Sequence, residues 1–295
     1  MKFTSDCFVA VGWNNKVTFY SGTGSIVVEH DISSFYPKIR QYPDRVNCMD
    51  ISPDNTTLAL GGSDGLVHVF DIRTNSFTYL FTFDHMTHNP MSKTVLDYTN
   101  KTVESVCWSK DSRYLYVGGA HYVYKVGMDN QIAQILYLTK TANSQVNTIN
   151  VTTDRVIVGT WDHYLYVFDQ DGTKLAQERM CSFVKAIGIS EDTNTFYVSV
   201  RNLMNSALIK YNLETGAMIN SVSTKSESWI NAIAVHGDSV YLASNDNAVY
   251  RYSKDDMEYV GTKYYGFCHA EGIEVSADGT KLIAFDRSTI QVINW

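Results

Sequence analysis

The sequence contains little proline and no run of apolar residues long enough to cross a membrane. Proline occurs 4 times in 295 residues and tyrosine 20 times, a balance typical of regular strands rather than of linkers. No stretch approaches the roughly eighteen apolar residues of a membrane-spanning helix, and Met1–Asp6 lacks the apolar run of a signal peptide. We therefore expect a cytoplasmic protein that does not insert into a membrane.

Positive charge is also scarce, because Lys and Arg number 24 against 31 Asp and Glu, for a formal net charge of -7. An acidic chain without a basic block is poorly suited to the phosphate backbone of a nucleic acid, so we expect no nucleic-acid partner. The 5 cysteines are an odd number and contain no C-x-x-C pair, which favours reduced core thiols over a disulfide framework. Hydrophobic residues make up 44% of the chain, enough for a large buried core.

Motifs of catalysis are missing as well. The sequence has no G-x-S-x-G, H-E-x-x-H, P-loop or dinucleotide-binding fingerprint. His85 and His88 follow Asp84 closely, but a metal site would need a third or fourth ligand on a rigid frame. We therefore expect no metal ion, no cofactor and no enzymatic activity.

An internal repeat organises the whole chain. Its pattern is an apolar residue, a polar one, a small one, apolar residues at the fourth and sixth positions, and Asp at the ninth. Full copies are Val46–Asp54, Val103–Asp111, Val146–Asp154, Val184–Asp192, Ile230–Asp238 and Ala270–Asp278, and Met1–Asp6 is a clipped copy. A mean period of about forty-five residues favours propeller blades over leucine-rich or helical repeats. The recurrent Asp residues are expected to be turn formers whose carboxylates accept backbone N–H groups.

Each copy is followed by further strand-like runs that complete a unit of four strands. After the second copy, Leu58–Leu60, Leu66–Phe70 and Phe77–Phe83 follow in order, and Ser63-Asp64-Gly65 suits a tight hairpin between the first two. No segment shows a convincing 3.6-residue period, so essentially no helix is expected. The chain is therefore predicted to be all-β, a single seven-bladed β-propeller of four-stranded antiparallel blades. The expected domain is 1–295, with blades at about 1–32, 46–83, 103–139, 146–180, 184–224, 230–265 and 270–295.

Small residues occupy the third position of the repeat, on the first strand of each unit. Because the blades of a propeller converge on its axis, small residues there relieve crowding between first strands. These residues are Cys48, Ser105, Thr148, Ala186, Ala232 and Gly272.

The last unit holds only three expected strands, Ala270–Ser276, Lys281–Phe285 and Thr289–Ile293. This count predicts that the last blade is three-stranded and that Thr289–Trp295 forms an edge, with no Lys or Pro to discourage pairing. We expect that edge to be covered by a strand from a partner or by sequence of a longer parent chain.

Two units end in residues that resemble WD40 repeats. Val69-Phe70-Asp71-Ile72 and Val167-Phe168-Asp169 are similar to the WD dipeptide that closes the third strand, with Phe in place of Trp. Ser52-Pro53-Asp54 and Gly61-Gly62-Ser63-Asp64 resemble the same repeats, and the resemblance covers nearly the whole chain. The Gly-His pair of the family is absent, so its Asp-His-Ser/Thr-Trp hydrogen-bond network is expected to be incomplete in every blade. The resemblance implies a WD40-type β-propeller that holds other proteins.

Partner-binding residues are expected on the top face, formed by the loops between blades and by the turns between second and third strands. Trp161 occupies a turn position where WD40 repeats usually carry a small residue, and Trp229 directly precedes a first strand. The long connection Ser33–Arg45 adds aromatic and basic residues, and the second repeat position adds polar ones. The expected set is Tyr36, Arg40, Tyr42, Arg45, Asn47, Glu104, Asn147, Trp161, Lys185, Trp229, Asn231 and Glu271.

These observations favour a non-catalytic scaffold that binds a protein or peptide on this face, as part of a larger complex, because Trp, Tyr and Arg are the residues that dominate binding hot spots. The alternative is a propeller enzyme or small-molecule binder that uses the central channel, supported by the mixed Asn, Glu and Lys residues but lacking a converging set of carboxylates or histidines. A second alternative stays open for Trp161 and Trp229, which could instead fill gaps between blades. Fold alone does not choose among these functions.

Overall fold

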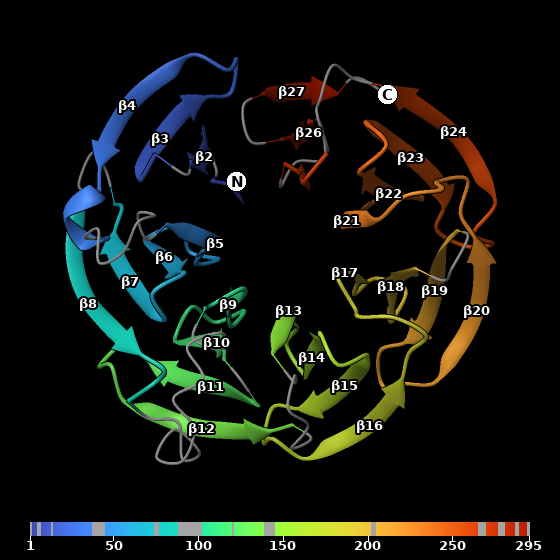
Figure 1. Cartoon of the computed structure of the whole chain (residues 1–295), viewed down its shortest axis with the longest axis horizontal. Coiled ribbons are helices and arrows are strands. Elements are labelled where there is room, and N and C mark those ends of the chain that lie inside the picture. Colours follow the sequence, from blue (N-terminus) through green and yellow to red (C-terminus); the bar gives the residue numbers. More distant parts are fainter. Residues whose placement is uncertain are drawn as a thin grey trace. The chain divides into compact units, whose positions relative to one another are not determined.

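The computed structural model of the chain (Figure 1) describes residues 2–4, 7–12, 14–36, 45–73, 77–87, 102–119, 121–138, 145–201, 205–264, 270–276, 281–286 and 289–293. Within these residues the protein is all-β, with one short 3-10 helix at Ser33–Phe35. Six sheets have four strands and the last has three. The predicted fold class, a seven-bladed β-propeller with a three-stranded last blade, is confirmed.

The chain divides into two compact units, Met1–Asp154 and Arg155–Trp295. The strands of the first unit are β1 (Lys2–Phe3), β2 (Cys7–Val11), β3 (Lys16–Ser21), β4 (Ile26–Asp31), β5 (Val46–Ile51), β6 (Thr57–Gly62), β7 (Leu66–Asp71), β8 (Thr78–Asp84), β9 (Val106–Trp108), β10 (Tyr114–Gly118), β11 (Tyr122–Gly127), β12 (Ile132–Tyr137) and β13 (Val146–Val151). Each run of four consecutive strands forms one blade, in chain order, beginning with β1–β4.

The strands of the second unit are β14 (Arg155–Thr160), β15 (Tyr164–Asp169), β16 (Lys174–Arg179), β17 (Ala186–Ser190), β18 (Thr195–Arg201), β19 (Ser206–Asn212), β20 (Met218–Ser223), β21 (Ile230–His236), β22 (Ser239–Ser244), β23 (Ala248–Ser253), β24 (Tyr259–Tyr264), β25 (Gly272–Val275), β26 (Leu282–Phe285) and β27 (Ile290–Ile293). Figure 1 shows the strands of each blade side by side in chain order, for example β17 to β20. In the last blade β27 pairs with β26 alone among the described residues.

A β-bulge recurs at one place in the six four-stranded blades. In each, the register between the third and fourth strands shifts just before the next-to-last residue of the third strand, here called the closing residue, which adds local twist there. The shifts fall at Phe19/Tyr20, Val69/Phe70, Lys125/Val126, Val167/Phe168, Lys210/Tyr211 and Arg251/Tyr252. Four of the closing residues are buried aromatics, namely Phe70, Phe168, Tyr211 and Tyr252. The position that resembles the WD dipeptide is therefore a core position.

A small residue lets the first strands of two neighbouring blades approach closely in the second unit, although it stands at the fifth repeat position rather than at the predicted third. Within the second blade, a Cβ on Gly61 of β6 would lie 2.5 Å from Sγ of Cys48, its partner on the first strand β5. In the second unit a Cβ on Gly188 would overlap the side chain of Ile233, which lies on the first strand of the following blade. Interiors packed this tightly do not accept extra methyl groups without a shift of the neighbours.

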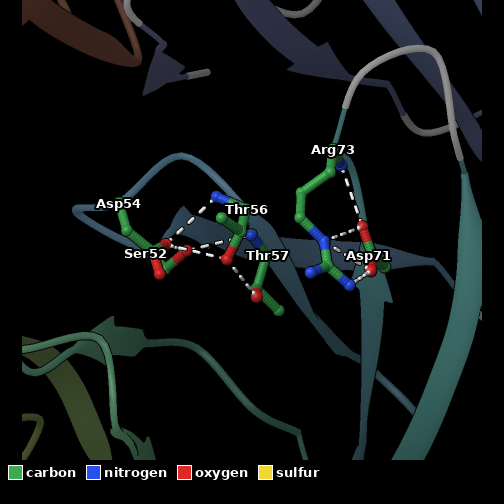
Figure 2. A network of polar contacts seen from close by, with 6 residues as sticks. All are labelled: Ser52, Asp54, Thr56, Thr57, Asp71 and Arg73. Atoms are coloured by element: carbon green, nitrogen blue, oxygen red, sulfur yellow. Dashed lines mark hydrogen bonds and ion pairs between the residues drawn. The ribbon is translucent and has the colours of Figure 1, made fainter.

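Recurrent aspartates shape the turn after the first strand in several blades (Figure 2). Asp54 Oδ1 accepts hydrogen bonds from Thr56 N at 3.1 Å and from Ser52 Oγ at 2.6 Å. Ser52 Oγ in turn accepts from Thr57 N at 2.9 Å, which ties the turn to β6. The hydroxyl and amide groups lower the pKa of Asp54 against the opposing effect of burial.

The third and fifth blades repeat this device. Asp111 accepts from Ser109 Oγ at 2.6 Å and from Arg113 N at 3.1 Å, and these groups lower its pKa to about 2. Asp192 accepts from Lys254 Nζ and from Ser190 Oγ, each at 2.5 Å, and its pKa is likewise lowered to about 2. The predicted role of the recurrent aspartates in turns is confirmed for these positions and for Asp54.

The same expectation is wrong for Asp238. This residue is exposed, and within the described residues its carboxylate accepts no hydrogen bond. The reason is a shorter turn, because His236 pairs directly with Ser239 and leaves only Gly237 and Asp238 in the hairpin. Gly237 has φ +54°, so the glycine rather than the carboxylate makes this turn possible. Asp6 and Asp278 lie outside the described residues.

No helix within the described part of the chain has both the length and the apolar character needed to pass through a membrane.

Candidate functional site

Three aromatic side chains from three different connections of the second unit stack on one another. Trp161 lies in the turn between β14 and β15, Phe183 between β16 and β17, and Trp229 between β20 and β21. The ring centroids of Trp161 and Phe183 are 4.4 Å apart at an interplanar angle of 34°. Those of Phe183 and Trp229 are 4.3 Å apart at 16°. Arg201, the last residue of β18, places its guanidinium carbon 5.2 Å from the Trp229 ring centroid. We call these four residues the aromatic stack.

Solvent reaches the aromatic stack. Trp161 exposes 44% of its surface, and Phe183, Arg201 and Trp229 are half-buried. A tryptophan that fills a gap within a core is almost fully enclosed, which Trp161 is not. The stack therefore presents a large rigid apolar surface of the kind that binding hot spots use.

Backbone hydrogen bonds hold Trp161 and Phe183 together. Val184 N, next to Phe183, donates to Thr160 O, next to Trp161, at 3.2 Å. Within the turn, Thr160 Oγ1 donates to Asp162 Oδ1 at 2.5 Å and accepts from Tyr164 N at 3.2 Å. These bonds hold the backbone segments that carry Trp161 and Phe183 in place relative to each other.

The connection that carries Trp229 is held by hydroxyl groups. Thr224 Oγ1 donates to Ser206 O at 3.0 Å, and Ser206 Oγ donates to Ser228 O at 2.5 Å. Asn245 N donates to Trp229 O at 2.9 Å. The tryptophan therefore projects from a connection that is anchored to two other segments of the second unit.

A buried four-residue network supports the same connection in the sixth blade. Asp246 Oδ2 accepts from Ser226 Oγ at 3.0 Å and from Tyr250 OH at 2.6 Å, and Ser226 Oγ lies 2.7 Å from Ser244 Oγ. Burial, followed by this carboxylate, raises the pKa of Tyr250. The sequence predicts an incomplete network in every blade because the Gly-His pair is missing. In agreement with this, the network of the sixth blade contains neither the His nor the Trp, and a serine before the first strand and a tyrosine on the third strand bond the turn aspartate.

The predicted polar residues of the second unit also lie together. Lys185 Nζ donates to Asn231 Oδ1 at 2.5 Å. Asn231 Nδ2 donates to Ala270 O at 2.8 Å and to Asn245 Oδ1. Glu271 is half-buried and follows Ala270. Lys185 and Asn231 are thus bonded to each other across two successive blades.

In the first unit, Asn47 Nδ2 donates to Glu104 Oε1 at 3.4 Å. Arg45 is exposed, and its backbone N donates to Ser63 Oγ at 3.0 Å. Ser63 lies in the turn between β6 and β7, at the position where WD40 repeats usually carry a small residue, and its hydroxyl bonds the backbone just before the first strand β5. Asn147 is half-buried. Of the other predicted residues, Arg40 and Tyr42 lie outside the described residues.

Tyr36 is predicted to lie on the binding face, but only 2% of its surface is exposed. Its ring packs edge-on against His68 with centroids 5.0 Å apart, and its hydroxyl donates to Leu60 O at 3.5 Å. Burial raises the pKa of this phenol. The helical turn Ser33–Phe35 directs the chain inward, and Gly62 leaves room, since a Cβ there would lie 2.7 Å from the Tyr36 ring. Tyr36 is therefore a core residue of the first unit.

No group of three or more His, Cys, Asp or Glu side chains able to hold a metal ion occurs within the described ranges. His85 is fully buried, and His88 lies outside those ranges.

Sequence reasoning missed two members of the aromatic stack, Phe183 and Arg201. Phe183 had a signal, because it directly precedes the repeat that begins at Val184, just as Trp229 precedes the one that begins at Ile230. Arg201 had none, because it stands at the end of a second strand, a position that the repeat does not mark.

Comparison with known proteins matches residues 37–71 to the family described as WD domain, G-beta repeat. A curated relative, the serine-threonine kinase receptor-associated protein of Dictyostelium discoideum, is 38% identical over 78 residues. That match spans 26% of this chain and 23% of the relative, so it covers about a quarter of the relative's length.

A chain from the crystal structure of the mitotic checkpoint complex superimposes with a TM-score of 0.73 and 16% identity, covering 94% of this chain and 80% of that one. At this identity the likeness concerns the fold alone.

Proposed function

Because this chain is a WD40-repeat-like β-propeller, we propose that it is a non-catalytic scaffold that binds a protein or peptide partner on the aromatic stack. Propellers of this family generally act as protein-interaction scaffolds. The observation that carries the proposal is Trp161, which is 44% exposed while its ring stacks on Phe183. An exposed tryptophan on a rigid support supplies apolar contact area at a small cost in conformational entropy.

The comparisons favour protein partners over other classes. The curated relative is named as receptor-associated, and the similar solved structure belongs to a multiprotein complex. A net charge of -7 argues against a nucleic-acid backbone as the ligand. The proposal therefore includes membership of a larger protein complex, with Lys185 and Asn231 as further contact residues near the stack.

The proposal is tested by affinity purification of the full chain from cells, with crosslinking and mass spectrometry. Trp161→Ala is the test variant, and Met218→Ala is the matched control, since Met218 is 58% exposed on β20 in the same unit. We expect Trp161→Ala to lose the proteins that the unchanged chain captures, Met218→Ala to retain them, and Trp161→Phe to retain part of the binding.

Thermal unfolding of each variant is the control for folding. Trp161 is largely exposed, so its truncation is expected to leave the transition within a few degrees of the original, as for most surface substitutions. The proposal is wrong if Trp161→Ala captures the same proteins as the unchanged chain. It is also wrong if the loss of capture appears only together with unfolding.

A further inference from the structure

The two ends of the aromatic stack differ in chemistry. Phe183 lies between Trp161 and Trp229, so its faces are covered, and Trp229 is covered by Phe183 and by Arg201. The surfaces left for a ligand are the outer face of the Trp161 ring at one end and the guanidinium of Arg201 at the other. One end is apolar and flat, and the other is cationic.

Arg201 is held in place without being neutralised. Its Nη2 donates to Glu227 O, a backbone carbonyl, at 3.3 Å, and its Cζ lies 5.2 Å from the centroid of the Trp229 ring. No carboxylate of the described residues forms an ion pair with it. A guanidinium carries five N–H donors, and among the described residues the bond from Nη2 to Glu227 O uses one of them on a group that is already oriented.

On this basis, and resting on the proposed function, we propose that the aromatic stack binds a short extended peptide segment whose Asp or Glu carboxylate contacts Arg201 and whose flat apolar side chain covers Trp161. Guanidinium and carboxylate match as a planar pair of charge-assisted hydrogen bonds. The rings of Pro, Phe, Tyr or Trp offer the flat face that stacks on tryptophan.

The size of the stack sets the length of the segment. Its steps are 4.4 Å, 4.3 Å and 5.2 Å from Trp161 through Phe183 and Trp229 to Arg201. An extended chain advances about 3.3 Å per residue, so roughly four or five residues separate the apolar side chain from the carboxylate. The connections on both sides are already fixed by hydrogen bonds, so the site is ordered before the ligand arrives.

A carboxylate fits this site better than a phosphate does. Phosphorylated peptides are usually bound by clusters of arginines, and the aromatic stack offers a single guanidinium. The second nearby cation, Lys185, already donates to Asn231. The proposal therefore assigns the anion to an Asp or Glu side chain.

The probe is an array of immobilised nonapeptides that carry one Glu and one Pro, Phe or Trp at varied spacing in a Gly/Ser background. Matched arrays carry Gln or phosphoserine in place of Glu. The full chain is applied to all three, and the strongest Glu peptide and its Gln counterpart are then titrated by fluorescence anisotropy. We expect binding to favour Glu peptides at a spacing of about four or five residues.

The variants separate charge recognition from a structural effect. Arg201→Gln is expected to weaken the Glu peptide about tenfold and to leave the Gln peptide unchanged, with Arg201→Lys in between. Trp161→Ala is expected to weaken both peptides, and Met218→Ala neither. Arg201→Gln is compared with the unchanged chain in thermal unfolding, so a folding defect would be visible separately.

The inference is overturned if the unchanged chain binds Glu and Gln peptides equally, binds only phosphoserine peptides, or binds none. Equal weakening of both peptides by Arg201→Gln would also overturn it, because Arg201 would then act only by supporting Trp229. If cellular capture is still lost with Trp161→Ala in any of these cases, the proposed function stands and only the acidic-peptide assignment fails.

Discussion

His68 makes the stability of the first unit depend on pH. It lies on β7 with 3% of its surface exposed, and its Nδ1 is 2.7 Å from Thr82 Oγ1. Its ring packs against Phe35 at 5.3 Å and Tyr36 at 5.0 Å between centroids. Burial lowers the pKa of His68 from 6.5 to about 4, because the charged imidazolium would lose its hydration.

The direction of the effect follows from proton linkage. The unfolded chain binds the proton below about pH 6.5, whereas the folded chain takes it up only near pH 4. Between these values the unfolded state holds more protons, so the free energy of unfolding falls as the pH falls. From pH 7 to pH 4.5 this single group is expected to remove roughly 2 kcal/mol of stability, and above pH 6.5 it removes nothing further.

The assay is urea unfolding followed by tryptophan fluorescence at several pH values, for the unchanged chain and for His68→Gln. Glutamine can still bond Thr82 and cannot titrate in this range. The variant is expected to be less stable at pH 7, because its side chain does not fill the same space. Between pH 7 and pH 4.5 it should lose roughly 2 kcal/mol less than the unchanged chain.

Parallel pH curves for the two proteins would refute the reasoning, since they would mean that His68 does not titrate differently on unfolding. His30, whose pKa is also lowered by burial, is present in both proteins and cancels in the comparison. Thr82→Val is a second control, because it keeps the buried ring and should retain most of the pH dependence.

Two further predictions concern buried groups elsewhere. Lys254, whose side chain is 6% exposed, pairs with Asp192 at 2.5 Å. Asp192→Asn leaves a buried ammonium without its anion, so it should cost more stability in urea unfolding than Lys254→Met, by about 1 kcal/mol or more. Equal losses of stability would show that the attraction between the two charges contributes nothing. Cys107 is half-buried and burial raises the pKa of its thiol to about 12, whereas Cys181 is exposed. Iodoacetamide at pH 8 should therefore modify Cys181 within minutes and Cys107 far more slowly, as read by peptide mass spectrometry. Equal labelling rates would contradict the raised pKa of Cys107.

The repeat by itself determined the fold of this protein. Apolar residues at the fourth and sixth repeat positions and Asp at the ninth are spaced for a strand followed by a turn. Seven copies of this pattern predict the seven blades of a propeller. The closing residues Phe70 and Phe168 are buried where the pattern places them. Local periodicity carries this information because each blade pairs strands that are neighbours in the sequence.

Tertiary structure alone decided which side chains reach the surface. Tyr36 and Trp161 are both aromatic residues in connections, yet one is 2% exposed and the other 44%. Asp238 has the recurrent position of Asp54 but sits in a shorter hairpin. Arg201 meets Trp229 only because β18 ends beside a connection that lies more than twenty residues further along the chain. Exposure and such contacts depend on packing between distant segments, which a repeat pattern does not encode.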